Sequence, residues 1–203
     1  MADYTYNRGR KLPGELLTPD EVRALMRACN RGPTGARNQA MLTLLWRAGL
    51  RIGETLGLRP ADLDSRAGLV RVRGEVAKGG KPRAVGLDPE AFAALEAWLM
   101  KRHALGINGH SPVFCTLKGE RLDGGYCRAM IKRLARRAGI THRVHLHGLR
   151  HTHAVELVRE GVPLPHVQAQ LGHSSLSVTS RYLAHVTPED LSNQARSRPR
   201  WHR

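Results

Sequence analysis

The sequence predicts a mainly helical fold with a small antiparallel sheet, an α+β domain. Apolar residues recur at helical spacing through most of the chain. A strictly alternating pattern occurs only around residues 70–73, where valine and arginine alternate. The 203 residues contain no internal repeat and no low-complexity linker. We therefore expect one compact domain over residues 17–186, between a flexible basic arm (1–16) and a C-terminal helix with a basic tail (187–203).

Capping and stop signals mark the helices of the first half. Residues 18–21 (Thr-Pro-Asp-Glu) form a capping box with proline at N1, and apolar residues follow at helical spacing up to Cys29. A second apolar face runs over 40–48 and ends at a glycine. A short helical turn is expected over 51–56, and a longer helix begins at Asp88-Pro89.

The second half is also predicted to be helical, with short breaks at glycines. We expect a basic helix over 125–138, a helix with an apolar stripe from Leu146 to Leu157 that ends at Gly161, a helix over 164–171 with a terminal glycine cap, a helix from Ser174 or Ser175 through Tyr182, and a short helix capped by residues 187–190.

The only clear sheet signal lies between residues 70 and 85. After the alternating strand at 70–73, residues 76–78 and 81–85 flank the pair Gly79-Gly80. Two glycines between short extended runs are typical of a tight hairpin turn, because both turn positions need a positive φ. The pattern therefore predicts a hairpin with 76–78 and 81–85 as its strands.

The charge balance indicates the class of partner. Lysine and arginine total 33 against 17 aspartates and glutamates, so the formal net charge is +16 at pH 7. Such an excess repels itself in a compact fold, so nucleic acid is the first partner to expect and an anionic membrane the second. Aromatic residues make up only 4%, too few for the stacking platforms of single-strand binders. Double-stranded DNA held through its phosphates is the better expectation.

Several classes of protein are disfavoured. The apolar stretch 40–46 is too short to span a bilayer, and no apolar segment follows Met1 as in a secretory signal. Cys29, Cys115 and Cys127 form no CxxC pair, which argues against a disulfide framework or a structural zinc site. We therefore expect no membrane association and a location in the reducing cytoplasm.

Five histidines lie within residues 142–153. His147 and His151 are four apart and share a helix face, but Gly148 stands where the HExxH zinc motif has its glutamate, so we disfavour a metal site. His147 and Arg150 are three apart and are also helix neighbours. An arginine at the edge of an apolar stripe needs an anionic partner, and beside a group that titrates near neutrality it suits phosphate chemistry. This pair alone favours a DNA-contacting face or an internal ion pair without catalysis.

The wider pattern changes that interpretation. The motif HGLRHT at 147–152 is followed by LGHSS at 171–175 and SRY at 180–182, and it is preceded by AGLRIGE at 48–54 and KGGK at 78–81. In this order and spacing the motifs are together highly specific. The sequence resembles the catalytic domain of the tyrosine recombinases, the phage integrase family, over about residues 17–186.

The resemblance implies roles for six residues, with a seventh in support. Arg51 and Arg150 would hold the scissile phosphate, Lys78 would be the lysine of the β-hairpin, His147 and His173 would be the two motif histidines, and Tyr182 would be the nucleophile. Glu54 falls where the family often has an acidic residue that supports the site. Lys81 competes with Lys78 but lies on the far side of the glycine turn, and we favour Lys78.

The chemistry of these groups agrees with the resemblance. Guanidinium forks match phosphate oxygens and stabilise the charge of the transition state. A tyrosine hydroxyl is mostly protonated at neutral pH. His147 is the candidate to accept its proton, and the neighbouring cations favour the phenolate form. Lys78 would protonate the leaving 5′-oxygen. A covalent 3′-phosphotyrosine and a free 5′-hydroxyl would result. Because the phosphotyrosine conserves the bond energy, we expect neither a metal nor a cofactor.

The resemblance also raises questions about the two ends of the chain. Family members usually carry an N-terminal helical domain that closes a clamp around DNA, and here only about 17 residues precede the catalytic domain. The chain is either naturally minimal or part of a longer integrase, and we expect weak, salt-sensitive binding to a single site. The free protein should be a monomer, whereas recombination needs a synaptic homo-tetramer. A contact with a neighbouring subunit would use apolar residues of the C-terminal segment: Leu183, Val186, Leu191 and Trp201.

Two other functions compete with site-specific recombination. A type IB topoisomerase shares the chemistry but relaxes supercoils without choosing a site. A non-catalytic DNA-binding regulator would use 163–171 and 174–182 as a helix-turn-helix, which leaves Arg51, Lys78 and His147 unexplained. Candidates for DNA contacts lie on the basic helix: Arg128, Lys132, Arg133 and Arg136. The family implies a bacterial, archaeal or phage-encoded protein associated with the nucleoid.

Overall fold

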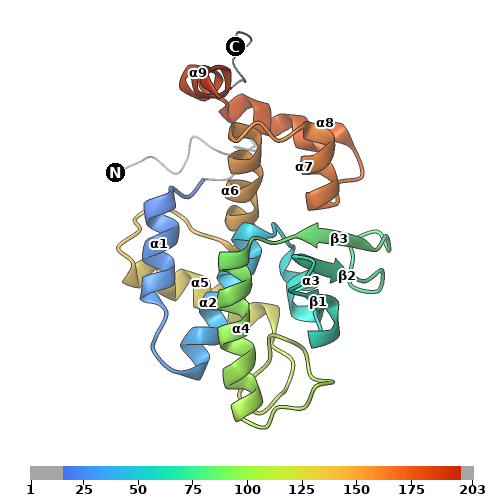
Figure 1. The fold of residues 1–203 in the computed structure, drawn as a ribbon. Helices are drawn as coiled ribbons and strands as arrows, with labels where there is room; N and C mark the ends of the chain where they lie inside the picture. The colour runs from blue at the N-terminus through green and yellow to red at the C-terminus, as the bar shows by residue number, and fades with distance from the viewer. Residues whose placement is uncertain (1–15, 198–203) are drawn as a thin grey trace, which may run out of the picture.

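The computed structural model describes residues 16–197, so the predictions for the basic arm up to residue 15 and for the tail from residue 198 lie outside the described residues. The described part is helical with one small sheet, which confirms the predicted fold class (Figure 1). In chain order the elements are α1 (Pro19–Ala28), α2 (Pro33–Arg47), α3 (Ile52–Gly57), the 3-10 turn η1 (Pro60–Asp62), β1 (Leu63–Asp64), β2 (Leu69–Val72), β3 (Arg83–Gly86), α4 (Pro89–Ala104), α5 (Gly124–Arg137), α6 (Leu146–Arg159), α7 (Leu164–Leu171), α8 (Leu176–Ser180), the 3-10 turn η2 (Arg181–His185) and α9 (Pro188–Arg196).

The predicted helix signals act as expected. The Thr18 hydroxyl accepts from the Glu21 amide, and the Glu21 carboxylate accepts from the Thr18 amide, so the capping box of α1 is complete. Gly172 ends α7 in the left-handed conformation, with φ of 65°. The helix expected through Tyr182 stops earlier: α8 ends at Ser180, and Tyr182 lies on η2.

The sheet is antiparallel with the strand order β1-β2-β3. Val70 pairs with Val85 across β2 and β3, and both side chains are buried. The predicted hairpin is therefore wrong in its register, because residues 76–78 form a turn and not a strand. Val76 instead packs on α3, where a Cβ added at Gly57 would lie 2.4 Å from a Val76 methyl. Val76 and the buried Ala77 thus reach the core through a turn, and a long loop joins β2 to β3.

The core has two parts, and α6 belongs to both. Helix α2 packs against α4 and α6 in the larger part, where Trp98 is fully buried and its indole donates to the Val113 carbonyl at 2.8 Å. A smaller cluster joins the second half of α6 to α7 and to Tyr182. Figure 1 shows α6 running from the main body into this upper part of the molecule. Side chains early in α6 therefore face the junction between the two parts.

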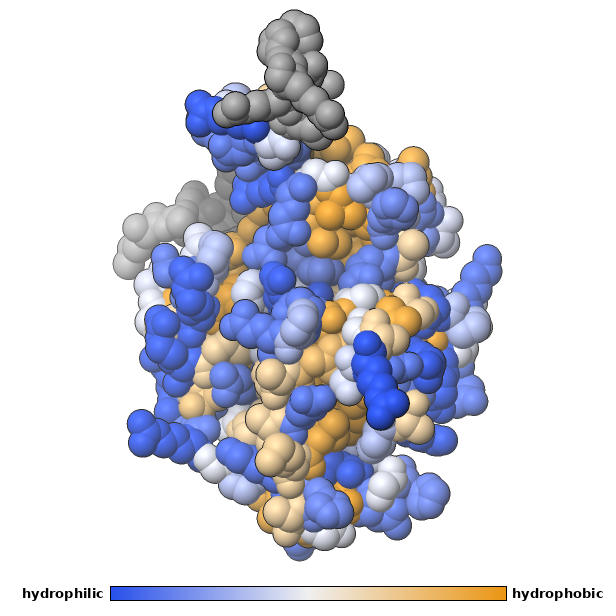
Figure 2. All heavy atoms as spheres, in the orientation of Figure 1, coloured by the Kyte–Doolittle hydropathy of each residue, from blue (hydrophilic) through white to orange (hydrophobic). Residues whose placement is uncertain are grey.

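The surface is strongly polar. Figure 2 shows hydrophilic side chains over most of one face, with apolar patches between them. In the described part of the chain, no helix is both long enough and apolar enough to span a membrane.

Candidate active site

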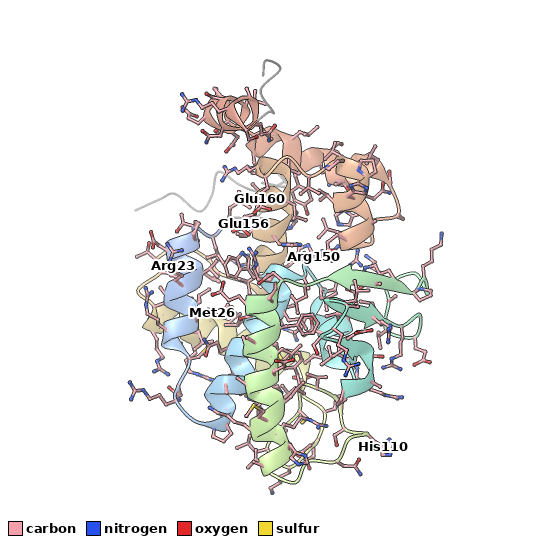
Figure 3. All side chains as sticks on the ribbon, viewed as in Figure 1. Arg23, Met26, His110, Arg150, Glu156 and Glu160 are labelled. Carbon is pink, nitrogen blue, oxygen red and sulfur yellow. The ribbon has the colours of Figure 1, made fainter. Side chains whose placement is uncertain are left out.

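Arg150 lies at the junction of the two parts of the core (Figure 3). Its side chain is almost fully buried, at 1% exposure, and its guanidinium donates to two backbone carbonyls, those of Gly49 and Leu171. Its Nε has no hydrogen-bond partner in the described structure. Burial lowers the Arg150 pKa to about 10, and repulsion from Arg51 acts in the same direction. Arg150 is thus a cation at neutral pH that retains an unused donor.

Arg51 reaches the same place from the other side. It is the N-cap residue of α3, and it donates to the Glu54 carboxylate at 3.0 Å and to the Gly172 carbonyl at 3.3 Å. The two arginines therefore meet at neighbouring carbonyls, those of Leu171 and Gly172, at the C-terminus of α7. A helix C-terminus carries partial negative charge, which holds two like-charged guanidinium groups together in the free protein.

Glu54 ties Arg51 to a third arginine that the sequence analysis missed. Arg83, on β3, donates to both Glu54 carboxylate oxygens, each at 2.9 Å. Burial acts to raise the Glu54 pKa, but hydrogen bonds from Arg83 and from the Arg51 backbone, together with both charges, lower it to about 2. The predicted supporting position of Glu54 is therefore occupied by a buried carboxylate shared by two arginines. The sequence pattern that could have indicated Arg83 is its position two residues before Val85, which places both side chains on the inward side of β3.

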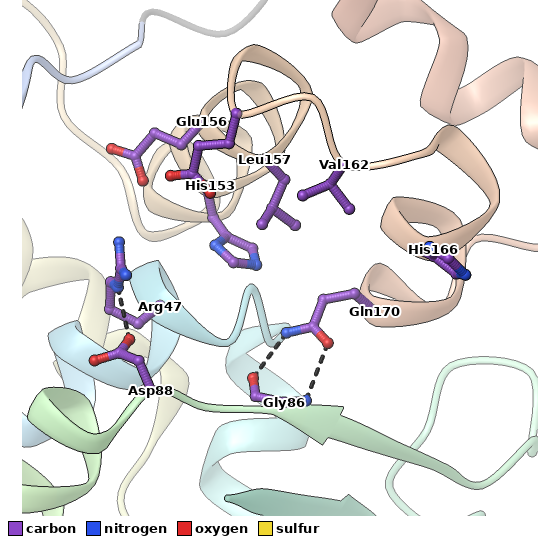
Figure 4. Close-up of a pocket in the computed structure, with 10 residues that line it drawn as sticks. Arg47, Gly86, Asp88, His153, Glu156, Leu157, Val162, His166 and Gln170 are labelled. Carbon is purple, nitrogen blue, oxygen red and sulfur yellow. Dashed lines mark hydrogen bonds and ion pairs between the residues drawn. The ribbon is translucent and has the colours of Figure 1, made fainter. Parts of the chain in front are cut away.

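A clasp holds α7 against the strand that carries Arg83. The Gln170 side chain accepts from the Gly86 amide at 3.0 Å and donates to the Gly86 carbonyl at 2.8 Å (Figure 4). Because β3 is an edge of the sheet, these backbone groups are free to pair with a side chain. The clasp fixes the end of α7, and with it the carbonyls that Arg51 and Arg150 contact.

Tyr182 lies against the histidines of this cluster. Its hydroxyl is 3.0 Å from His151 Nδ1, and its ring stacks on His173 with 6.3 Å between centroids. The side chain is only 7% exposed. Burial raises the Tyr182 pKa above its ordinary value of 10.0, and the charges of Arg150 and Arg51 act to lower it. The cations thus act in the predicted direction, but burial outweighs them in the free protein.

The motif histidines are neutral at pH 7 in the free protein. Desolvation lowers the His147 pKa to about 4, and the charges of His151 and Arg150 add to this effect. Desolvation followed by the charges of Arg150 and Arg51 lowers the His173 pKa to about 4 as well. His173 Nδ1 lies 3.0 Å from the hydroxyl of buried Thr179. A bound phosphate anion would oppose the arginine charges and raise both histidine pKa values.

The structure also brings the two candidate lysines to this side of the molecule. Lys78 and Lys81 are exposed on the loop between β2 and β3, and both line a cavity of about 490 Å³ together with His173 and Arg83. Either ammonium group can therefore approach the cluster from the loop. The four candidate DNA-contacting residues lie elsewhere, exposed on the outer face of α5: Arg128, Lys132, Arg133 and Arg136.

Metal ligands are not clustered here. Within residues 16–197, no three histidine, cysteine, aspartate or glutamate side chains are placed to hold a metal ion. The rings of His147 and His151 meet edge to face with 4.3 Å between centroids, and His151 Nδ1 points to the Tyr182 hydroxyl.

Comparison with known proteins gives consistent matches. The family model described as "Phage integrase family" matches residues 15–189. A "Tyrosine recombinase XerC" of Thermodesulfovibrio yellowstonii is 36% identical over 179 residues, covering 85% of this chain and 58% of the relative. A "Tyrosine recombinase XerD" of Mycobacterium leprae is 36% identical over 185 residues, covering 86% of this chain and 57% of the relative. The chain thus spans a little over half the length of these relatives.

Two solved structures are similar across nearly the whole chain. A XerA recombinase superposes with a TM-score of 0.75 at 29% identity, covering 92% of this chain and 66% of its own. A XerH site-specific recombinase, bound to palindromic difH substrate in a post-cleavage complex, has a TM-score of 0.75 at 26% identity, covering 96% of this chain and 55% of its own.

Proposed function

The chain belongs to the phage integrase family, and from this premise we propose that it is a tyrosine-type site-specific recombinase that cuts and rejoins DNA strands. We assign catalysis to residues 17–186. One observation supports this most strongly: the Tyr182 hydroxyl lies in the same buried cluster as Arg51 and Arg150, two cations whose other partners are backbone carbonyls and Glu54. A nucleophile and phosphate-binding cations in one place are what phosphoryl transfer to a side chain requires.

The proposed reaction begins when a DNA phosphate binds at the end of α7, beside the carbonyls that Arg51 and Arg150 contact. Arg51 and Arg150 donate to its non-bridging oxygens, and His147 and His173 add hydrogen bonds. The Tyr182 oxygen attacks phosphorus, the bond to the 5′-oxygen breaks, and Lys78 supplies the proton that the leaving oxygen needs. The product is a 3′-phosphotyrosine and a free 5′-hydroxyl. Attack by the 5′-hydroxyl of another strand reverses these steps and joins new partners.

Double-stranded DNA is the proposed partner. Charge supports this, because the chain has a formal net charge of +16 and the exposed basic side chains of α5 form one face of a helix. The similar XerH recombinase was solved bound to its palindromic difH substrate. We place the DNA backbone across α5 and the Tyr182 cluster, and we place the protein at the DNA of a bacterial or archaeal cytoplasm.

A synaptic tetramer is proposed to use the segment from residue 187 onward. Helix α9 has no buried residue, and Leu191 and Leu183 are among the exposed large apolar side chains. Such side chains can bury area against a neighbouring subunit. Removal of residues 187–203 should leave cleavage within about threefold of the full chain and should reduce strand exchange. Equal losses in cleavage and exchange would show that the segment serves the fold of one subunit.

The test of the proposed function is covalent trapping. A duplex site is first selected by binding from a random-sequence library. It is then nicked near the cleavage position so that the short fragment carrying the released 5′-hydroxyl diffuses away and rejoining fails. The wild-type chain should form a protein–DNA adduct that survives denaturant, and Tyr182→Phe should form none while binding the duplex normally. A regulator would give no adduct with either protein.

The topoisomerase alternative is tested separately, with supercoiled plasmids. It requires relaxation of supercoiled plasmids that lack the selected site, at rates comparable to plasmids that carry it. The recombinase proposal expects cleavage to depend on the site.

A further inference from the structure

His151 is the histidine that contacts the Tyr182 hydroxyl. Its Nδ1 lies 3.0 Å from the hydroxyl oxygen, a normal hydrogen-bond distance, and the two rings are tilted with 5.7 Å between centroids. His151 follows Arg150 directly on α6. Helix α6 therefore carries both Arg150, which is proposed to bind the phosphate, and the histidine that contacts the attacking Tyr182 oxygen.

The other two histidines are placed for different tasks. His173 stacks flat against the Tyr182 ring, and its Nδ1 is engaged by the Thr179 hydroxyl. His147 packs edge-on against His151, one helical turn away, and makes no hydrogen bond to Tyr182 in the described structure. Of these three histidines, only His151 presents a ring nitrogen to the Tyr182 hydroxyl within the described residues.

We propose that His151 is a catalytic residue that accepts the Tyr182 proton through Nδ1 when the tyrosine attacks. This inference rests on the proposed function and replaces His147 in that step. The bond from Tyr182 Oη to hydrogen breaks as the bond from Nδ1 to hydrogen forms, and the oxygen's electron pair forms the bond to phosphorus. The bond from phosphorus to the 5′-oxygen breaks, and that oxygen takes a separate proton from Lys78. In the rejoining step His151 returns its proton to the departing tyrosine oxygen.

The surroundings of His151 favour its acting as an acceptor. Burial lowers its pKa below the ordinary 6.5, and the charges of His145, Arg150 and His185 act in the same direction, so the free ring is neutral. The tautomer with its proton on Nε2 leaves the Nδ1 lone pair for the hydroxyl. A DNA phosphate bound to Arg150 offsets part of the Arg150 charge that lowers the His151 pKa, so the His151 ring becomes more basic at the moment of attack.

The experiment compares His151→Gln with Lys78→Ala on two versions of the nicked duplex. One version has the natural 5′-oxygen at the cleavage position and the other has sulfur there. A thiolate leaves without a proton, so the sulfur substrate should restore Lys78→Ala and should not restore a variant that lacks the base. Glutamine keeps a hydrogen-bonding side chain at position 151 but takes up no proton at neutral pH.

We expect His151→Gln to form the adduct about 100-fold or more slowly on both substrates, with duplex affinity within about twofold of wild type. Normal affinity shows that the variant is folded. His166→Gln, the same substitution at an exposed position of α7 outside the cluster, should react at the wild-type rate. The proposal is overturned if His151→Gln reacts within about threefold of wild type, or if sulfur restores it as it restores Lys78→Ala. Absence of an adduct from the wild-type chain would instead refute the proposed function.

Discussion

Replacing Glu54 by glutamine removes the charge that holds Arg51 and Arg83 together while keeping the size of the side chain. The carboxyl is 1% exposed, and its pKa falls from an ordinary 4.5 to about 2 in the folded chain. At about 1.4 kcal/mol per pH unit, this difference corresponds to about 3 kcal/mol of stability that depends on the charged form. We therefore expect Glu54→Gln to lower the free energy of unfolding at pH 7 by about 3 kcal/mol.

The pH dependence identifies the cause. A carboxyl whose pKa is lowered in the folded state stabilises the fold fully above about pH 4.5. This stabilisation is lost as the pH falls from 4.5 toward 2. The difference in unfolding free energy between wild type and Glu54→Gln should therefore become smaller as the pH falls from 4.5 to 2. Urea titrations followed by tryptophan fluorescence, to which buried Trp98 contributes, measure this difference in unfolding free energy.

A matched control separates this effect from the general effect of removing a charge. Glu75 also bonds an arginine, Arg73, at 2.7 Å, but its side chain is 76% exposed. Glu75→Gln should change stability by less than about 0.5 kcal/mol, because exposed pairs are screened by water. A stabilising role for the buried Glu54 charge is refuted if Glu54→Gln lowers the unfolding free energy no more than Glu75→Gln at pH 7. It is also refuted if the difference in unfolding free energy between Glu54→Gln and wild type is the same at pH 7 and pH 3.

Three further outcomes are expected. Gly172→Ala should destabilise the fold more than Gly139→Ala. Both glycines have positive φ, so alanine costs about 1 kcal/mol at each position, but only the Cβ at position 172 would lie 2.8 Å from the Arg83 guanidinium. Equal melting temperatures for the two variants would contradict this. Burial lowers the His153 pKa to about 3, so the wild type should lose stability as the pH falls from 7 to 5.5, and His153→Gln should lose less over that interval. Arg128→Ala should weaken duplex binding and reduce the slope of log affinity against log salt by about 0.9, if the side chain contacts one phosphate; an unchanged slope would place it outside the DNA interface.

Elements with local signals were predictable from the sequence. The capping box at Thr18 and the glycine stop at Gly172 fix their helix ends through bonds within a few residues, and both occur where expected. The hairpin was not predictable in this way. Two adjacent glycines allow a tight turn but do not require one, and Val76 is drawn instead into a contact with Gly57, some twenty residues earlier in the chain.

The candidate site was predictable as a set of residues but not as a set of contacts. The motifs named Arg51, Arg150 and Tyr182, and the structure places them in one cluster. Their partners depend on long-range packing that no local pattern contains. Arg83 on β3 meets Glu54 on α3 across 29 residues of sequence. His151 meets Tyr182 because η2 folds back onto α6.

The most direct measurement locates the covalent bond to DNA. The trapped adduct is digested with nuclease and trypsin, and the nucleotide remnant is mapped by mass spectrometry. Tyr182 lies directly after Arg181, so cleavage there gives a peptide ending at Arg196 that contains no other tyrosine. We expect the remnant on this peptide alone, attached through a 3′-phosphate. A remnant on the peptide of Tyr126, or a 5′-phosphate linkage, would contradict the account.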